Sequence, residues 1–370
     1  MRPSSPEATE AALADRIRQL LEGVPWLKGW QVKQHPSDAD SRTDLVATLP
    51  TAGGRKTVLL VECKRELRPS VFASWTEPPA SNRYESSVRV LGMPFVSPRL
   101  RDLCAAKGWS WFDLTGNHRL DVPGLLRLEH TGEKPTQRPP RAKANLATLA
   151  AGSILRVLLA PEEAGKHWTQ RDLQTNCHPR VSIGLVNKVV RHLLDQAFLE
   201  EGAEGGFRLS SPLALLQAWR DVYRFDRHER LGHFTLLQGN QLRDALASFA
   251  ARAEGSALYA AFSAAEFQAP HVRQPKTWLY VRRSGIREFE RVLEAKPVDS
   301  GENLVVLIPQ DHGIFHLPDR GRANERRMPC TNPVQTYLDL HHSGGRGQEA
   351  AEAVLEQRLK PAWKTKGLVK

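Results

Sequence analysis

Two carboxylates and a lysine stand at the ends of two short apolar runs near the start of the chain. Asp44 precedes the run LVATLP, and the run KTVLLV leads into Glu62 and Lys64. Both runs have the composition of strands, and the residues around Gly53 supply turn chemistry, so the stretch predicts a β-hairpin. Positions equidistant from Gly53 then pair, which places Asp44 opposite Glu62. Side chains alternate along a strand, so Lys64 shares the face of Glu62.

This grouping suits the cleavage of phosphodiesters. Paired carboxylates can hold Mg²⁺ or Mn²⁺, and the metal polarises a phosphoryl oxygen and activates a bound water. A neighbouring lysine orients that water and offsets the charge that builds on phosphorus. We therefore expect Asp44 and Glu62 as metal ligands, and Asp44, Glu62 and Lys64 together as the catalytic residues. The alternative is an ordinary hairpin whose strand ends carry solvated charges, because such a short string of residues is common by chance.

The pattern of an aspartate followed on the next strand by Glu-x-Lys resembles the PD-(D/E)xK superfamily of restriction-endonuclease-like folds. Thr43-Asp44 stands here in place of the usual Pro-Asp. The resemblance implies that a glutamate of the first helix joins the metal site. The sequence leaves open whether Glu10 or Glu22 does so.

The stretches around the hairpin predict a mixed sheet with helices on both faces, closing near Glu133. Prolines interrupt any long helix soon after Lys64, so only Asn82–Leu91 is left for a short one. Ser97 and Pro98 then start a helix. Besides the hairpin, the expected elements are helices at residues 8–24 and 98–107 and strands at 30–34, 93–96, 109–114 and 125–128.

Composition limits the class of protein. A chain of 370 residues with 41% hydrophobic residues is expected to form two or three globular domains. Its four cysteines are scattered, so neither a disulfide framework nor a zinc site is indicated. With no long apolar run and no apolar signal region, we expect a cytoplasmic, nucleoid-associated protein without a membrane partner. The net charge of +11 favours a polyanion, and between Thr136 and His192 basic residues outnumber acids by six.

The basic stretch coincides with a pattern typical of a winged helix-turn-helix. Residues 147–209 read as three helices followed by a ribbon, and the third helix starts at Ser182. Its polar face would lie in the major groove of duplex DNA, where Asn187 reads adenine while Lys188 and Arg191 reach guanine or phosphate. Many winged helices instead bind protein, which stays an alternative. The residues expected to bind DNA are Arg171, Arg180, Ser182, Asn187, Lys188, Arg191 and His192.

The remainder of the chain, from about residue 147, resembles the AbiEi-type antitoxins of type IV toxin–antitoxin systems. The resemblance rests on YRFDRHERLG (223–232), YAAFSAAEFQAPHVRQPKTWLYV (259–281), ENLVVLIPQDHGIF (302–315) and NPVQTYLDLHHSGGRGQEAAEAVLE (332–356). It implies promoter binding through a winged helix, repression of the protein's own operon, and a C-terminal α/β domain that supports regulation. A nuclease-like domain in front of the winged helix departs from the usual family pattern.

We therefore predict an α/β multidomain protein: a PD-(D/E)xK nuclease-like mixed sheet, a central winged helix-turn-helix and a C-terminal α/β domain. The expected boundaries are residues 1–133, a basic proline-rich linker at 134–146, then 147–212 and 213–370. The expected function is that of an antitoxin-like transcriptional regulator that binds double-stranded DNA as a homodimer, with a cognate toxin or neighbouring-gene protein as partner. The alternative is a Mg²⁺-dependent DNA endonuclease, of a defence or mobile-element system, that the winged helix targets.

Overall fold

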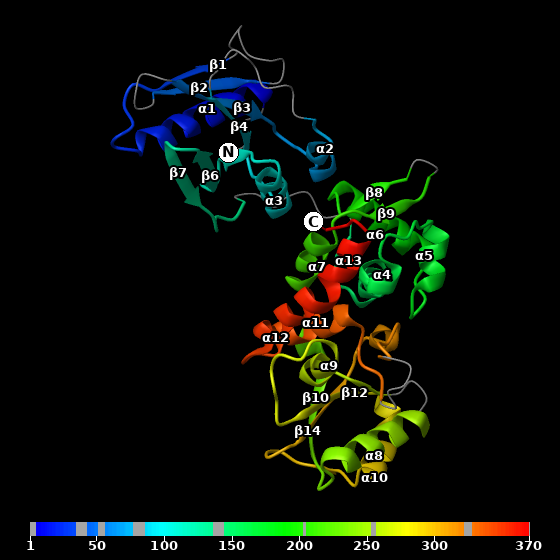
Figure 1. The fold of residues 1–370 in the computed structure, drawn as a ribbon. Helices are drawn as coiled ribbons and strands as arrows, with labels where there is room; N and C mark the ends of the chain where they lie inside the picture. The colour runs from blue at the N-terminus through cyan, green and yellow to red at the C-terminus, as the bar shows by residue number, and fades with distance from the viewer. Residues whose placement is uncertain are drawn as a thin grey trace. The chain divides into compact units, whose positions relative to one another are not determined.

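The chain divides into two compact units, residues 1–141 and 142–370, and the division falls inside the predicted linker. The predicted mixture of helices and sheets is confirmed (Figure 1). None of the described helices is long and apolar enough to cross a membrane. The computed structural model describes residues 5–34, 43–50, 56–76, 86–135, 144–202, 205–252, 257–321 and 328–369.

The first unit is built on a mixed sheet whose seven strands lie in chain order. The pairs β3–β4 and β4–β5 are parallel, and the other neighbours are antiparallel. The predicted mixed sheet is thus confirmed. The strands are β1 (Gln31–Gln34), β2 (Leu45–Pro50), β3 (Lys56–Cys63), β4 (Ser86–Met93), β5 (Ser110–Asp113), β6 (His118–Val122) and β7 (Leu126–His130).

The hairpin of β2 and β3 has the register that the sequence predicts. Leu45 pairs with Val61 and Pro50 pairs with Lys56, so pairs are symmetric about Gly53. The backbone N–H of Asp44 donates to the carbonyl oxygen of Val61 at 2.9 Å, one residue out of step with this register, so the regular ladder ends at Leu45. The predicted turn itself, residues 51–55, lies outside the described residues.

Helices cover both faces of this sheet, as expected. The first helix, α1 (Pro6–Glu22), is capped by the Ser5 side chain and has proline in its first turn, where the absent N–H costs nothing. Its apolar stripe packs against the face that contains Leu59 and Val61. On the opposite face, α2 (Pro69–Ala73) and α3 (Pro98–Ala106) share a cluster with Leu91 and Trp111.

The stretch before α3 contradicts the prediction. Residues 86–91 belong to strand β4, which runs to Met93, so both the short helix at 82–91 and the strand at 93–96 are wrong. Val90 packs on the face of α1 and Leu91 on the face of α3, and burial on both faces removes the alternation that marks a strand. The predicted strands also omitted β6.

The second unit begins with three helices and a two-stranded ribbon, in the predicted order. A bridge between Trp168 and Phe207 joins the segment just before the second helix to the ribbon. These elements are α4 (Leu149–Leu159), α5 (Gln170–Asn176), α6 (Ile183–Asp195), β8 (Leu199–Glu201) and β9 (Phe207–Leu209).

The rest of the second unit surrounds a five-stranded sheet of order β11-β12-β14-β10-β13, in which only β12 and β14 are parallel. The elements are α7 (Pro212–Arg220), η2 (Phe225–Arg227), β10 (Glu229–Phe234), α8 (Gly239–Arg252), β11 (Ala257–Tyr259), α9 (Ala261–Gln268), β12 (Thr277–Val281), η3 (Arg283–Gly285), α10 (Ile286–Val292), β13 (Lys296–Pro297), β14 (Leu304–Ile308), η4 (His312–Phe315), α11 (Pro333–His342), α12 (Gly347–Val354), η5 (Leu355–Leu359) and α13 (Lys360–Thr365).

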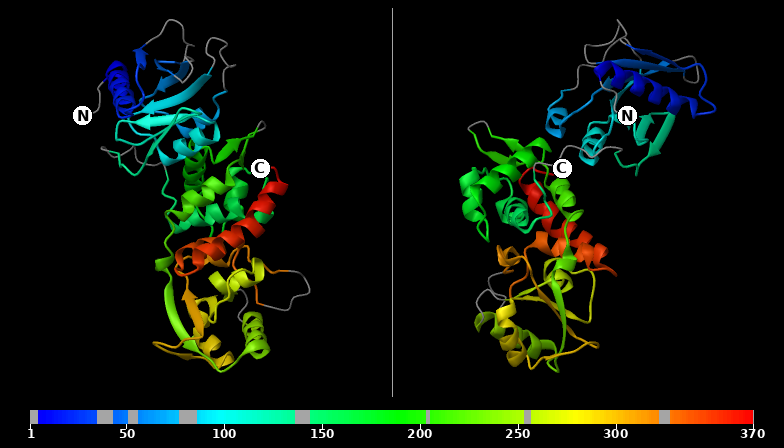
Figure 2. Two further views of the ribbon diagram at one scale, coloured as in Figure 1. Left: turned by 60° about the vertical axis from the view of Figure 1, so that its left-hand side comes forward. Right: turned by 180° about the vertical axis from the view of Figure 1, so that it is seen from behind.

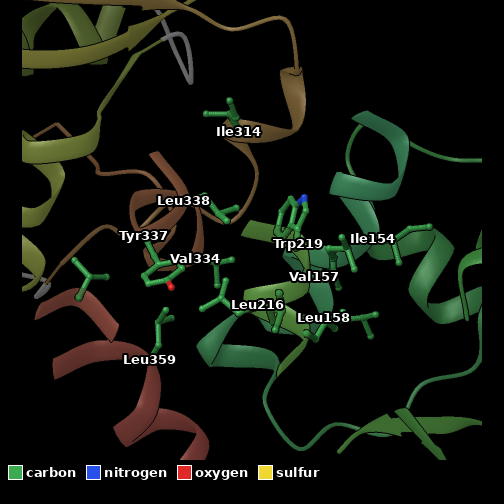
Figure 3. Packing of buried hydrophobic residues seen from close by; sticks show 14 of the residues in the cluster. Ile154, Val157, Leu158, Leu216, Trp219, Ile314, Val334, Tyr337, Leu338 and Leu359 are labelled. Atoms are coloured by element: carbon green, nitrogen blue, oxygen red, sulfur yellow. The ribbon is translucent and has the colours of Figure 1, made fainter. Parts of the chain in front are cut away.

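One apolar core joins the three-helix region to the rest of the second unit. Ile154 of α4, Trp219 of α7, Ile314 of η4 and Leu338 of α11 belong to the same buried cluster (Figure 3). The core therefore crosses residue 212, where the sequence predicts a domain boundary. A second buried cluster, on the other face of the sheet, is formed with α8 and α10.

Candidate functional sites: a carboxylate site and a basic helix face

The first unit brings Asp44 and Lys64 together at the end of the hairpin. The Oδ2 atom of Asp44 accepts a hydrogen bond from the backbone N–H of Cys63 at 2.7 Å. The same oxygen lies 3.7 Å from Nζ of Lys64, and about a third of each side chain is exposed. At this exposure the ion pair contributes little to stability, which leaves Lys64 able to turn toward another anion.

Glu62 lies in a different environment, which the sequence did not predict. Its side chain is 1% exposed, and its Oε1 atom lies 3.6 Å from Nη1 of Arg89 on β4. The Arg89 guanidinium also lies 5.8 Å from the centre of the Trp109 ring. Because the segment with Arg89 was predicted as a helix, its position one strand away from Glu62 was missed.

The donor types fit a hard divalent cation, since carboxylate oxygens are the ligands that Mg²⁺ prefers. The Arg89 guanidinium beside Glu62, however, already supplies part of the positive charge that a metal would bring. Among the described residues, no three His, Cys, Asp or Glu side chains gather closely enough to hold a metal ion. Burial and then the charges of Asp44 and Glu10 raise the pKa of the Cys63 thiol well above its usual range. Of the two candidate glutamates, Glu10 is thus within electrostatic reach of this end of β3.

In the second unit, α6 separates an apolar face from a polar one. The Ser182 hydroxyl caps the helix by accepting a hydrogen bond from the N–H of Leu185 at 3.3 Å. Val186, Val189, Val190 and Leu193 are buried on the inner face. Of the residues predicted to bind DNA, Arg171, Arg180, Ser182, Lys188 and Arg191 are exposed, whereas Asn187 and His192 are half-buried.

The exposed cations of this region are available to an anion. Arg171, Arg180, Lys188 and Arg191 form no ion pair with any residue that the structure describes. The ribbon differs, since Glu200 of β8 pairs with Arg208 of β9. The basic character therefore lies on α5, on α6 and on the turn between them.

Arg156 does not belong to this basic surface, although it contributes to the basic surplus of the sequence. Its side chain is 3% exposed, and Nη2 lies 2.6 Å from Oδ2 of Asp311. Its Nε atom donates to Oε1 of Gln335 at 2.9 Å. A buried arginine of this kind must be paired, because an isolated buried charge is very costly. The helical spacing of α4 gave no signal that would distinguish it from a surface residue.

The polar network around Arg156 continues into α11. The Tyr223 hydroxyl donates to Oδ1 of Asp339 at 2.8 Å and lies 2.9 Å from Nε2 of His228. The Nε2 atom of Gln335 donates to the same carboxylate oxygen at 2.7 Å. Burial raises the pKa of Asp339 to about 7, and burial lowers the pKa of His228 to about 4. Both side chains are therefore mainly neutral in a mildly acidic solution.

Comparison with known families bears on the second unit. Residues 208–360 match the family model described as "Transcriptional regulator, AbiEi antitoxin, Type IV TA system". The resemblance to AbiEi antitoxins is thus confirmed for this part of the chain, and residues 147–207, with α6, lie outside the match. No curated protein and no solved structure matches the chain.

Proposed function

Because residues 208–360 match the AbiEi antitoxin model, we propose that the protein is a transcriptional regulator of the antitoxin type that binds duplex DNA through α6. The observation that supports the proposal is the pair of exposed cations on α6, Lys188 and Arg191. They form no ion pair with any described residue, and the opposite face of the helix is buried. A helix of this kind fits the major groove of B-form DNA.

The side chains divide into two roles. Lys188 and Arg191 point from the exposed face of α6 and read guanine or phosphate, while Asn187 reads adenine. Arg171 and Arg180 lie outside α6 and hold the phosphate backbone. The order of three helices and a ribbon, with the bridge from Trp168 to Phe207, supports a winged helix-turn-helix. A homodimer would bind an inverted repeat, and the family match favours a cognate toxin as the genetic partner.

The test is the affinity of the whole chain for the DNA upstream of its own gene. Replacing Lys188 and Arg191 together by alanine should weaken binding by about 1–3 kcal/mol for each residue that reads a base. The matched control is the double variant Arg287→Ala and Lys296→Ala, which removes the same charge from exposed positions elsewhere in the second unit. Fluorescence anisotropy at two salt concentrations separates phosphate contacts from base contacts.

Equal affinities in the two double variants would overturn the assignment of α6 as the DNA-reading helix. Loss of binding in both would instead assign the interaction to net charge alone. The proposal requires loss in the α6 variant with retention in the control.

A second candidate is a Mg²⁺- or Mn²⁺-dependent endonuclease in the first unit. The ion pair of Asp44 with Lys64, at the end of the strand that contains the buried Glu62, favours it. Asp44 and Glu62 would hold the metal, which would supply Lewis-acid assistance, and Lys64 would orient the attacking water. The Arg89 guanidinium beside Glu62 opposes metal binding.

Cleavage of supercoiled plasmid with Mg²⁺ or Mn²⁺ tests this candidate. Cutting by the natural protein that disappears in Asp44→Ala and in Lys64→Ala would establish a nuclease. Lys56→Ala, an exposed lysine at the far end of β3, is the matched control and should cut normally. No cutting by the natural protein, with tight duplex binding retained, would leave the regulator.

A further inference from the structure

A short turn from the C-terminal part of the chain lies against the turn that precedes α6. The Nε2 atom of His316 donates to the backbone carbonyl oxygen of Asn176, the last residue of α5, at 2.7 Å. The rings of His316 and His178 lie 5.8 Å apart between centres. These contacts join residues far apart in sequence, so they do not arise from local chain geometry.

The same segment is fixed on its other side to α4. Asp311 accepts from the N–H of Gly313 at 2.8 Å and from Nη2 of Arg156 at 2.6 Å. Ile314, which is fully buried, anchors η4 in the buried cluster to which Trp219 also belongs (Figure 3). The segment 311–316 thus contacts both α4 and the turn between α5 and α6.

Gly313 permits this close approach. A Cβ atom at this position would lie 2.7 Å from Nη1 of Arg156 and 2.8 Å from the carbonyl oxygen of His178. Real Cβ contacts are essentially never this short, so a larger residue would push η4 and the turn before α6 apart. The reason for glycine here is space.

We propose that residues 311–316 are a positioning element for the DNA-reading helix: His316 and Gly313 fix the turn between α5 and α6, and thereby the direction in which α6 presents Lys188 and Arg191. The proposal rests on the proposed function. None of the residues of this element touches DNA. They act through the carbonyl groups of Asn176 and His178, which precede the Ser182 cap. The element lies inside the stretch that matches the antitoxin model, whereas α6 lies outside it.

The experiment compares His316→Ala, His316→Gln and His312→Ala in the whole chain. Glutamine retains an N–H donor for the Asn176 carbonyl, and His312 is an exposed histidine of the same turn that does not contact the α5–α6 turn in the described structure. Hydrogen exchange of the amides at residues 177–182 and affinity for the upstream DNA are measured for each, together with the melting temperature.

In His316→Ala we expect faster exchange at residues 177–182 and DNA affinity reduced about fivefold, which is the usual worth of one hydrogen bond. His316→Gln should recover most of both, and His312→Ala should change neither. Equal DNA affinity in natural protein and His316→Ala would overturn the positioning role while leaving the regulator intact.

Two further outcomes separate the proposals. Failure of the natural protein to bind duplex DNA would overturn the proposed function and this inference with it. Reduced affinity in His316→Ala with unchanged exchange at residues 177–182 would overturn the inference alone, because the effect would then bypass the turn. Gly313→Ala provides an independent check, since it should accelerate the same amides through crowding rather than through a lost hydrogen bond.

Discussion

At the scale of single residues, the second unit depends on a buried polar network more than on surface ion pairs. Arg156, Asp311, Gln335 and Asp339 are each no more than 5% exposed. Removing one partner of a buried ion pair costs about 3–5 kcal/mol, because the other charge is left without compensation. Exposed pairs such as Glu200 with Arg208 contribute about 1 kcal/mol or less. Core variants in this network should therefore affect stability first and DNA binding only as a consequence.

The network also sets how stability responds to pH. Asp339 has a folded-state pKa of about 7, above its ordinary 3.8, so its contribution is fully present at low pH and is lost as the pH rises toward 7. His228 has a folded-state pKa of about 4, below its ordinary 6.5, so its contribution is present above 6.5 and is lost as the pH falls toward 4. The two effects oppose each other in the natural protein.

Asp339→Asn should remove the first effect and leave the second. Between pH 5 and pH 7.5 the free energy of unfolding should then rise more steeply than in the natural protein, by on the order of 2 kcal/mol. Urea unfolding at the two pH values measures the difference. His228→Gln should have the opposite effect, because the free energy of unfolding should then fall as the pH rises. Parallel profiles in all three proteins would show that these groups titrate normally in the fold.

At the scale of elements, helices with caps and strands with one buried face were predictable. Ser182 and Thr169 predict the starts of α6 and α5, because each side chain accepts a hydrogen bond from a backbone N–H of the first turn. The β2–β3 register followed from Gly53 alone. Strand β4 was not predictable in the same way, since it is buried on both faces and its sequence SSVRVLGM lacks a clean period.

The same limit applied to the candidate sites. Residue type and hairpin symmetry suggested Asp44, Glu62 and Lys64, but they gave no sign of Arg89, which reaches Glu62 from a strand that was missed. Likewise, only the folded chain shows that the segment DHG at 311–313 contacts α4 and lies close to the carbonyl of His178. Contacts between distant segments depend on tertiary packing, which local patterns do not contain.

At the scale of the whole molecule, the extent of the second compact unit predicts which truncated chains fold. Residues 142–370 expressed alone should unfold in one cooperative transition. Residues 142–212 alone should not, because their core residues Ile154 and Leu158 pack in a cluster completed by Trp219, Leu338 and Trp363. Calorimetry and near-ultraviolet circular dichroism of the two fragments check this. A cooperative transition in the shorter fragment would show that the three helices and ribbon form an independent domain.

The contact between α13 and α4, the first helix of the second unit, has a consequence for synthesis of the chain. The indole N–H of Trp363, in α13, donates to the carbonyl oxygen of Leu159 in α4 at 3.4 Å across 204 residues of sequence. Figure 2 shows the C-terminal helices, in red, beside the green helices that begin this unit. At roughly 5–20 residues per second, a ribosome needs on the order of ten to forty seconds to travel from one to the other. During that interval α4 to α6 exist without their finished core, so the chain acquires its basic surface in final form only after α13 has been synthesised.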